Sequence, residues 1–464
     1  METKTVDNID FDHPIHIYFI GIGGISMSGL AGILLSKGFK ISGSDSKESD
    51  LTKNLEAQGA NVFYGQEESH IPDDADLIVY TAAIRENNPE YIHMKSCGIP
   101  YLSRAEFLGL LMKNYKVPVA VAGTHGKTTT TTMLSEIFLK ADLDPTITVG
   151  GVVKSVGSNI RNGAMDYFVF EACEYTNSFL SFFPKVSVIL NVEEDHLDFF
   201  KDIDDIRNSF NRFAKLLPAD GLLVINGEIE GIEKVTKDVA CPIVTYGSDD
   251  RFDYWPSDIT FDDKACPSYI CHVKKTGESF TVKLDVTGVH NVMNSLAAIA
   301  VSDAVKVPRE ALLSALSECS GSKRRFEYRG SFNGVTVIDD YAHHPTEIKA
   351  TLKASMNYPH KKLWCVFQPH TYTRTKAFLH EFAEVLSLAD HVVLADVYPA
   401  REKDIYGCNS SNLYEELKKL GTDCTYLHSF EEIEEFLHKN CINGDLLITM
   451  GAGDVVKIAD RLTS

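Results

Sequence analysis

The chain has 464 residues, of which 44% are hydrophobic and 24% are charged, as is typical of a folded protein with a sizeable core. Its net charge of −20 argues against a nucleic-acid or anionic-membrane partner, and no apolar run approaches the ~20 residues that a membrane helix needs. The polar N-terminus has no apolar segment of the signal-peptide kind. The sequence therefore predicts a cytoplasmic protein of about two to four domains with reduced, structural cysteines.

Near the N-terminus, an apolar strand pattern runs directly into a glycine-rich turn. The strand covers residues 15–20, and the turn contains Gly21, Gly23 and Gly24 before an apolar helix pattern. A second strand pattern ends at Asp45, about 20 positions later, where a carboxylate can hold a ribose. This layout is typical of a dinucleotide-binding fold, although a strand–helix turn without a ligand gives the same pattern.

Two further features narrow the ligand expected in this first section. Ser26 stands where the dinucleotide fingerprint has its third glycine, which weakens an NAD site and leaves a general diphosphate site. Later strand patterns end at Thr81 and Arg104. The carboxyl ends of such strands are expected at one ligand-binding edge of the sheet.

The second section opens with the most informative stretch of the chain. A strand pattern at residues 117–122 meets Gly-Thr-His-Gly-Lys-Thr at residues 123–128, and a helix pattern follows. In such a phosphate cradle the backbone N–H groups face the anion, the lysine adds positive charge, and the threonine can reach Mg²⁺. Because Val121, and not a glycine, stands five positions before Gly126, the turn is two residues shorter than the common phosphate loop. The stretch predicts a nucleoside triphosphate site.

Carboxylates, a histidine and two asparagines mark the rest of this section. Glu171 and Glu174 follow one short apolar strand pattern, and His196 follows another. Near a phosphate loop such side chains can hold Mg²⁺, whereas any one of them alone could be a solvated loop residue. Asn291 and Asn294 share one face at the start of a later helix, where they could bond a base or a phosphate.

Polar clusters follow three successive strand patterns in the last section. They begin at Asp340, His370 and Pro399. Their concentration at strand ends favours a functional site at one sheet edge over scattered surface groups. Alternating strand and helix patterns in all three sections predict an α/β fold with largely parallel sheets.

Ten segments between about His16 and Asp454 form a recognisable set. They are HIYFIGIGGISMSGLA, SGSD, AGTHGKTTT, EACE, NVEEDHLD, GVHNVMNSLAA, RRFEYRG, DDYAHHPTE, QPHTYTRT and DVYPAREKDIYG. Together they resemble the Mur ligase family. The central segments are shared by all Mur ligases and by folylpolyglutamate synthetases, whereas GIGGISMSGLA, DDYAHHPTE and QPHTYTRT more specifically resemble the alanine-adding branch and its recycling relative.

The resemblance implies three domains and an ATP-driven reaction. It implies a Rossmann-like UDP-sugar-binding domain at residues 1–114, a central ATP-binding domain of the P-loop type with a mostly parallel sheet at 115–321, and a C-terminal Rossmann-like, amino-acid-binding domain at 322–464. The implied reaction joins L-alanine to the muramoyl carboxylate of UDP-N-acetylmuramate through an acyl phosphate, in peptidoglycan precursor synthesis. The expected ligands are these substrates, ATP and two Mg²⁺ ions. We expect a monomer or homodimer with no nucleic-acid or membrane partner.

The resemblance assigns residues of this chain to each ligand, motif by motif. The implied ATP-binding residues are Gly123, Thr124, His125, Gly126, Lys127, Thr128, Thr129, His290, Asn291, Asn294, Arg325 and Asp340. The implied UDP-sugar-binding residues are Gly21, Gly23, Gly24, Ser26, Ser44, Asp45, Thr81, Arg104 and His125, with His125 toward the muramoyl group. The implied amino-acid-binding residues are Tyr341, His343, His370 and Arg374. The implied metal ligands are Thr128, Glu171 and His196, and the implied catalytic residues are Lys127, Glu171, His196 and Arg325.

The sequence departs from the family pattern at one place and leaves alternatives open. Tyr175 and Thr176 replace the Ser-Asp pair that follows the second glutamate in many relatives. No lysine of this chain matches the one that several Mur ligases carbamylate. The alanine-adding branch is expected to do without this modification. The alternatives are a recycling ligase that attaches a preformed peptide to the same UDP-sugar, and a non-catalytic UDP-sugar and ATP sensor. The N-terminal Rossmann-like section disfavours a folate-type polyglutamate ligase.

Overall fold

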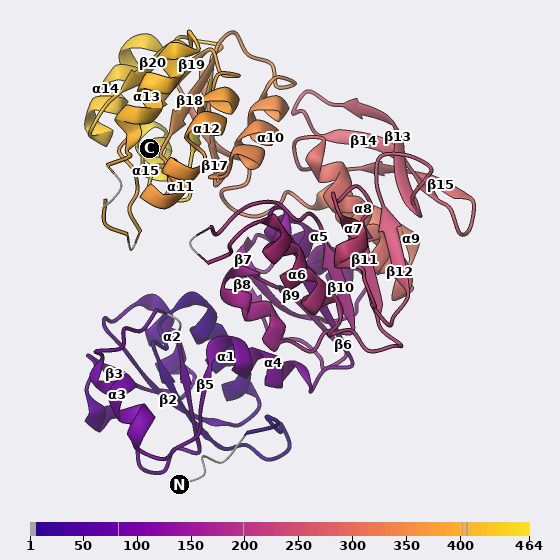
Figure 1. Ribbon diagram of the computed structural model, residues 1–464, viewed down its shortest axis with the longest axis vertical. Coiled ribbons are helices and arrows are strands. Elements are labelled where there is room, and N and C mark those ends of the chain that lie inside the picture. The colour runs from indigo at the N-terminus through magenta and orange to yellow at the C-terminus, as the bar shows by residue number, and fades with distance from the viewer. Residues whose placement is uncertain (1–5, 82, 198, 401, 405–406) are drawn as a thin grey trace.

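The computed structural model describes residues 6–81, 83–197, 199–400, 402–404 and 407–464. Outside the described residues lie Ala82, Asp198 and Arg401, which belong to strand-end segments noted above. Two further residues of DVYPAREKDIYG, Ile405 and Tyr406, lie outside them as well. Three separate β-sheets organise the chain, one in each of its three α/β domains (Figure 1). The predicted fold class is therefore confirmed, whereas the exact boundaries at 114/115 and 321/322 stay predictions.

The N-terminal sheet has five parallel strands in the order β3-β2-β1-β4-β5. The strands are β1 (His16–Ile20), β2 (Lys40–Asp45), β3 (Asn61–Tyr64), β4 (Leu77–Tyr80) and β5 (Tyr101–Ser103). The helices are α1 (Ile25–Ser36), α2 (Asp50–Ala57), η1 (Glu68–His70), α3 (Pro89–Ser96) and α4 (Arg104–Met112). The chain adds strands first on one side of β1 and then on the other, so the glycine-rich turn after β1 lies at the switch point where such folds bind ligands.

The central sheet has ten strands in the order β15-β14-β13-β12-β11-β10-β6-β9-β7-β8. The strands are β6 (Val117–Ala122), β7 (Thr146–Val153), β8 (Ser158–Arg161), β9 (Tyr167–Glu171), β10 (Val186–Ile189), β11 (Leu222–Asn226), β12 (Ile243–Tyr246), β13 (Tyr254–Phe261), β14 (Pro267–Val273) and β15 (Glu278–Lys283). The helices are α5 (Lys127–Lys140), η2 (Tyr175–Ser181), α6 (Ile203–Ala214), α7 (Ile232–Val235), α8 (His290–Ala304) and α9 (Arg309–Glu318). The pairs β7–β8, β13–β14 and β14–β15 are antiparallel, because their short connections leave no room for a crossover.

Tertiary packing, and not helix propensity, holds α5 in place behind the phosphate loop. The helix begins with a run of threonines, whose branched side chains are weak helix formers. Thr130, Thr131 and Thr132 are fully buried. The apolar residues of α5 share one core cluster with those of α8, so the loop rests on a helix that the rest of the domain stabilises.

The C-terminal sheet has six strands in the order β16-β17-β21-β18-β19-β20. The strands are β16 (Glu327–Phe332), β17 (Val335–Asp340), β18 (Leu363–Phe367), β19 (His391–Leu394), β20 (Cys424–Tyr426) and β21 (Leu446–Met450). The helices are α10 (Pro345–Ser355), α11 (Tyr372–Ala377), α12 (Leu379–Leu386), α13 (Ser410–Lys419), α14 (Phe430–Asn440) and α15 (Val456–Leu462). All neighbours are parallel except β16 and β17, and apolar clusters cover both faces of the sheet.

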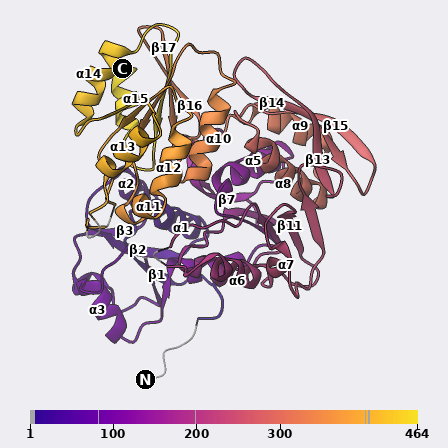
Figure 2. The ribbon, with the colours of Figure 1, turned by 45° about the horizontal axis from the view of Figure 1, so that its top comes forward.

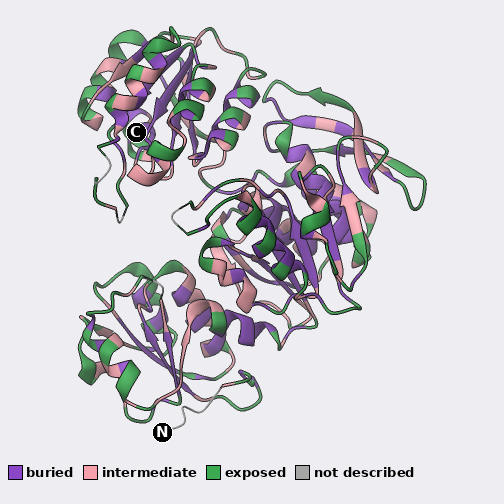
Figure 3. Ribbon diagram, viewed as in Figure 1, coloured by how far each residue is buried: buried purple, intermediate pink, exposed green. Residues whose placement is uncertain are grey.

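The three domains are joined in two different ways. The N-terminal and central domains share one apolar cluster, in which Phe107 and Leu111 of α4 belong with Phe179 of η2. Among the described residues, no apolar cluster joins the central and C-terminal domains. In both views helix α10 faces the central domain (Figures 1 and 2), and buried residues concentrate in the three sheets (Figure 3).

Two findings concern location and cysteine chemistry. None of the described helices is long and apolar enough to cross a membrane. All ten cysteines are free thiols, as expected from the sequence.

The apolar joint predicts a stability effect at Gly109 of α4. A Cβ at this position would lie 1.9 Å from the carbonyl oxygen of Ser181 in η2, a contact with rigid backbone. We expect Gly109→Ala to lower the free energy of unfolding by about 1–3 kcal/mol through overpacking. Thermal unfolding measures the effect. The matched control is Gly32→Ala in α1, where the nearest atom is 3.7 Å away and the change should be neutral or stabilising. Equal stability of the two variants would contradict this account of the joint.

Candidate functional site

Glycine at two positions shapes the phosphate loop between β6 and α5. Gly126 has a φ of +82° and caps α5 without a side-chain hydrogen bond, which leaves the N–H groups of the first helical turn available to an anion. Gly123 has a φ of +144°, and a Cβ there would lie 2.9 Å from the Cβ of Leu190. A side chain would strain the backbone at both positions. Backbone geometry therefore requires the glycines that the sequence analysis singled out.

The Lys127 side chain folds back over this loop. Its Nζ donates hydrogen bonds to the carbonyl oxygens of Gly123 at 2.5 Å and Thr124 at 3.1 Å, and to Glu174 Oε2 at 2.9 Å. Burial alone would lower the pKa of Lys127, but the adjacent Glu174 carboxylate raises it. The amine is therefore charged at neutral pH and lies against the backbone that would cradle a phosphate.

Thr128 and Glu171 lie together where α5 begins and β9 ends. The N–H of Gly150 donates a hydrogen bond to Glu171 Oε1 at 2.6 Å, and the side chain of Thr128 is close enough to help hold the pKa of this carboxyl down. A Cβ at Gly150 would lie 2.9 Å from Glu171 Oε2, so glycine leaves the carboxylate its place. Burial raises the pKa of Glu171. A hydroxyl and a carboxylate oxygen are donors that Mg²⁺ prefers, so this pair fits the predicted metal.

The structure places the third predicted metal ligand, His196, beside Glu174. Its Nε2 lies 3.7 Å from Glu174 Oε1 and 3.9 Å from Asp195 Oδ2, and its ring packs on that of Tyr175 with centroids 4.5 Å apart. Glu174 thus contacts both Lys127 and His196, a link that the sequence did not predict. The φ of His196 is +53°, an uncommon value outside glycine, and such strain clusters at functional sites.

A cavity of about 200 Å³ lies between the central and C-terminal domains. The predicted ATP-binding residues that line it are His125, Gly126, Thr129, His290, Asn291, Asn294, Arg325 and Asp340. The wall also includes Asn191, Asn226 and Tyr246, which the sequence analysis missed. Asn226 and Tyr246 end β11 and β12, and Asn191 lies two positions after the end of β10. A search for polar residues at every strand end would have found them.

Hydrogen bonds and burial fix the charge states within this cavity. Asn294 Nδ2 donates to Asn291 Oδ1 at 2.8 Å, so each amide orients the other. Desolvation by the cavity wall, with help from Arg325, lowers the pKa of His290, although the residue itself is exposed to solvent. Burial raises the pKa of Asp340 to about 6, although its carboxylate accepts two backbone N–H groups. The two amides and the imidazole can donate and accept hydrogen bonds, which suits a base or a ribose at this end of the cavity.

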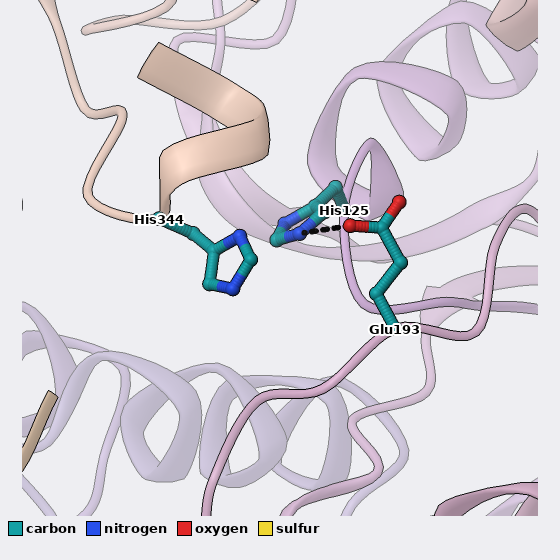
Figure 4. A group of neighbouring side chains, drawn as sticks. All are labelled: His125, Glu193 and His344. Carbon is teal, nitrogen blue, oxygen red and sulfur yellow. Dashed lines mark ion pairs between the residues drawn. The ribbon is translucent and has the colours of Figure 1, made fainter. Parts of the chain in front are cut away.

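Titratable side chains of both domains meet at the wall of the cavity, and Figure 4 shows three of them, His125, Glu193 and His344. His125 Nε2 lies 3.6 Å from Glu193 Oε2, and its Nδ1 lies 3.4 Å from Glu347 Oε1 of α10. Burial alone would lower the pKa of His125, but these two carboxylates raise it to about 9. The ring of His344 packs on His125 with centroids 4.5 Å apart, and its Nε2 lies 3.0 Å from the carbonyl oxygen of Glu194. The structure therefore places His125 against the C-terminal domain. The sequence analysis expected the muramoyl group beside this histidine.

The predicted amino-acid-binding residues lie together in the C-terminal domain. The rings of Tyr341 and His343 are 5.5 Å apart, those of His343 and His370 are 5.9 Å apart, and Arg374 Nη1 lies 3.2 Å from His370 Nδ1. Arg374, a predicted amino-acid-binding residue, pairs with Asp195 of the central domain, with Nη2–Oδ1 at 2.9 Å, and its contact with an amino acid stays a prediction. The sequence could not show this pair, because its members are 179 positions apart.

A second, small cavity adjoins Arg374. It measures about 30 Å³ and includes Asp195, His196, Thr371 and Glu402 in its lining. This is room for only a few heavy atoms, since one water needs ~10–15 Å³ on such a scale. The cavity lies between His196, a predicted metal ligand, and Arg374, a predicted amino-acid-binding residue.

The turn after β1 is closed by the end of β2. The N–H groups of Gly21 and Ile22 donate to the carbonyl oxygen of Ser44, and the N–H of Gly23 donates to Asp45 Oδ2 at 2.9 Å. A Cβ at Gly21 would lie 2.7 Å from Thr81 Cγ2, so the turn also packs against the end of β4. The sheet edge therefore brings together the residues predicted from three separate strands.

Ser26 and Arg104 meet at the same edge, whereas Ser44 does not contribute its side chain. Arg104 Nη1 donates to Ser26 Oγ at 3.0 Å, and Arg104 begins helix α4 where a loop was expected. Ser44 is fully buried and its hydroxyl donates to Glu90 Oε2 at 2.7 Å. Alternation along β2 points this side chain into the domain, while the Ser44 backbone closes the turn, so its place in the UDP-sugar site stays a prediction.

Sequence reasoning missed the role of Arg324, the neighbour of Arg325. Its guanidinium donates to Asp339 Oδ2 at 2.9 Å and to the carbonyl oxygens of Gly451 at 2.7 Å and Gly453 at 3.0 Å. It therefore anchors the start of the C-terminal domain, while Arg325 lines the cavity. No local pattern distinguishes two adjacent arginines.

Comparison with known families matches almost the whole chain. The matching descriptions are "Mur ligase family, catalytic domain" at residues 16–116, "Mur ligase middle domain" at 121–302 and "Mur ligase, glutamate ligase domain" at 324–453. A UDP-N-acetylmuramate–L-alanine ligase of Agathobacter rectalis is 58% identical over 98% of this chain and 99% of its own length. One of Lachnospira eligens is 56% identical over the same shares.

Two solved structures cover 97% of this chain and 98% of their own chains. The UDP-N-acetylmuramate–alanine ligase MurC of Thermotoga maritima is 29% identical with a TM-score of 0.78. The murein peptide ligase of Psychrobacter arcticus is 27% identical with a TM-score of 0.70. Both share the three-domain arrangement described above.

The ion pairs of His125 predict a pH dependence of stability. Its folded-state pKa of about 9 exceeds the ordinary value of 6.5, so the stabilisation is complete below pH 6.5 and is lost as pH rises through about 9. We expect the thermal unfolding midpoint of wild type to exceed that of His125→Asn by less at about pH 10 than at pH 6.5. Calorimetry at each pH measures the difference. An exposed histidine, changed as His380→Asn, is the control and should show little difference at either pH. A difference that grows with pH would contradict the ion-pair account.

Proposed function

The chain belongs to the Mur ligase family, and we propose that it joins L-alanine to the muramoyl carboxylate of UDP-N-acetylmuramate, with ATP, in the synthesis of peptidoglycan precursors. One observation carries this conclusion: relatives that bear this activity in their names are 56–58% identical over nearly the full chain. The proposal is supported by a cavity lined by predicted ATP-binding residues of two domains and by a diphosphate-type turn in the third domain. A cytoplasmic enzyme that is monomeric or homodimeric stays part of the proposal.

The reaction we propose passes through an acyl phosphate. A carboxylate oxygen attacks the γ-phosphorus of ATP and ADP leaves, which replaces a poor leaving group by phosphate. The amine of alanine then attacks the carbonyl carbon, loses a proton, and phosphate leaves. Two anions must meet in the first step, so the site has to concentrate positive charge. Lys127, the N–H groups at the start of α5 and Arg325 are placed to supply it.

Magnesium would be held by oxygen donors at the loop. Thr128 and Glu171 fit one Mg²⁺ ion, and His196, which lies beside Glu174, fits the second predicted ion. Bound Mg²⁺ would screen the repulsion between the phosphates and the incoming carboxylate. The protein's own part is to position the reactants, since placement contributes much of the rate in phosphoryl transfer.

The second cavity, beside His196 and Arg374, is where the acceptor would bind. Its volume of about 30 Å³ is too small for alanine or for a peptide, so the acceptor side would have to open for either. Since the structural relatives include a murein peptide ligase at 27% identity, the peptide-adding alternative has to be tested directly. A non-catalytic sensor is disfavoured, because such a protein has little use for Lys127 and a metal pair.

A panel of acceptors tests the proposed function. We expect purified protein with UDP-N-acetylmuramate, ATP and Mg²⁺ to release phosphate with L-alanine at least about 10²-fold faster, as kcat/KM, than with an alanine-led tripeptide. Glycine and L-serine are the size controls. Faster turnover with the tripeptide would assign the recycling reaction, and nucleotide binding without phosphate release from any acceptor would favour the sensor.

The loop lysine provides a second test. We expect Lys127→Ala to lower phosphate release by about 10³-fold or more, because it removes a positive charge from the site of phosphoryl transfer. Lys140→Ala is the matched control, since Lys140 lies at the exposed end of the same helix and pairs with Glu318. Near-normal turnover of Lys127→Ala would remove the amine from the mechanism.

A further inference from the structure

Three side chains between the central and C-terminal domains form a set that suggests a role beyond the proposed reaction, although one of them, His125, is also a predicted ATP- and UDP-sugar-binding residue. His125 follows β6, Glu193 follows β10, and His344 caps α10 of the other domain. One ligand atom from each lies within 4.8 Å of the other two. Figure 4 shows the two imidazoles side by side, with the Glu193 carboxylate next to His125. We propose that His125, Glu193 and His344 form a transition-metal site that bridges the two domains.

The hydrogen bonds around His344 leave a lone pair for a metal. Its Nε2 lies 3.0 Å from the carbonyl oxygen of Glu194, which can only accept, so Nε2 carries the proton. Nδ1 is then the basic nitrogen, and the hydrogen bond it accepts, from the N–H of Thr346, is long at 3.4 Å. Metal-ligating histidines are held in this way, with the second ring nitrogen bonded to a carbonyl or carboxylate.

His125 and Glu193 are oriented by the same kind of partner. Glu347 Oε1 lies 3.4 Å from His125 Nδ1, which leaves Nε2 of the same ring toward Glu193. That Nε2 is buried and has no hydrogen-bond partner among the described residues. A metal ion would displace the proton that this nitrogen carries at neutral pH. The hydroxyl of Thr346 donates to Glu193 Oε2 at 2.7 Å. All three ligands therefore have outer partners that fix their orientation.

The donor set selects the kind of ion. Two imidazoles and one carboxylate are a ligand set of zinc sites that keep one position open, whereas Mg²⁺ and Ca²⁺ prefer oxygen donors only. Tetrahedral Zn²⁺ places neighbouring ligand atoms ~3.4 Å apart. The atoms would thus have to approach by roughly 1 Å, a shift that side-chain rotation and a small adjustment of α10 can supply. Zn²⁺ and Co²⁺ are the expected ions.

A bound ion would have a mechanical consequence. His344 belongs to the C-terminal domain and the other two ligands to the central domain. The ion would therefore cross-link two bodies that enclose the larger cavity, and a cross-link slows any step that needs the cavity to open. Zn²⁺ is accordingly expected to act as an inhibitor; this consequence, unlike the binding site itself, rests on the proposed function.

Cobalt titration of the full chain tests the site. We expect the metal-free protein to bind one Co²⁺ per chain with the visible absorption of a tetrahedral ion. The spectrum should lack thiolate charge-transfer bands, since no cysteine is among the ligands. His344→Gln and Glu193→Gln should each weaken binding by about 10-fold or more. Glutamine at position 344 can still bond the Glu194 carbonyl, so the domain contact is kept.

Two matched histidine variants separate this site from its neighbours. His343→Gln changes the adjacent imidazole, and His196→Gln changes the predicted magnesium ligand. Both should still bind Co²⁺ with the same spectrum. Binding that is absent, or that is lost with His196→Gln and kept with His344→Gln, would overturn the proposal. Thermal unfolding of each variant without metal checks that the chain is folded.

Phosphate release provides the functional arm. With saturating Mg²⁺, micromolar Zn²⁺ should inhibit wild type at least about 10-fold more strongly than His344→Gln. Equal inhibition of both would overturn the cross-link. If wild type releases no phosphate with any acceptor, the proposed ligase function fails, and the cobalt spectra still decide the metal site.

Discussion

A charge buried without a partner costs several kcal/mol, and this constraint governs how the central and C-terminal domains meet. Asp195 enters the contact only because Arg374 crosses from the other domain to hold it. His125 is charged only because Glu193 and Glu347 flank it, one from each domain. Removing Arg374 would leave Asp195 to bear the cost of desolvation, and removing either Glu193 or Glu347 would leave His125 with a single carboxylate partner. The contact is therefore specific in geometry, and it encloses the larger cavity only when the charges match.

The two contacts between domains have different roles in the proposed reaction. An apolar core fixes the UDP-type turn and the phosphate loop within one body, so the donor sugar and the nucleotide would always be presented in the same relation. The residues predicted to receive the amino acid belong to the other body, which is held by polar contacts. Such an arrangement allows the acceptor side to open and close while the phosphoryl-transfer geometry is kept.

Local patterns in the sequence were enough for the fold class, the three sheets and the residues at most strand ends. Strand and helix periodicity predicts the secondary-structure elements. The glycines of the two turns mark positions where the backbone geometry requires glycine. Pairings between distant segments could not be predicted. Asp195 with Arg374, Glu174 between Lys127 and His196, and the division of labour between Arg324 and Arg325 all depend on how the domains pack. Ser44 shows the same limit within one strand, because a shift of a single position decides on which face of the sheet a side chain lies.

The contrast between an apolar and a charged joint also means that solution conditions act on them separately. Apolar contact weakens on cooling and strengthens with salts that are excluded from protein surfaces. Ion pairs as buried as Arg374 with Asp195, whose side chains are 11% and 9% exposed, are screened by salt much less than pairs at the surface. A concentrated salt of the excluded kind should therefore tighten the hold of the N-terminal domain and change that of the C-terminal domain little. Cooling and salt thus act mainly on the apolar joint, whereas pH acts mainly on the charged one.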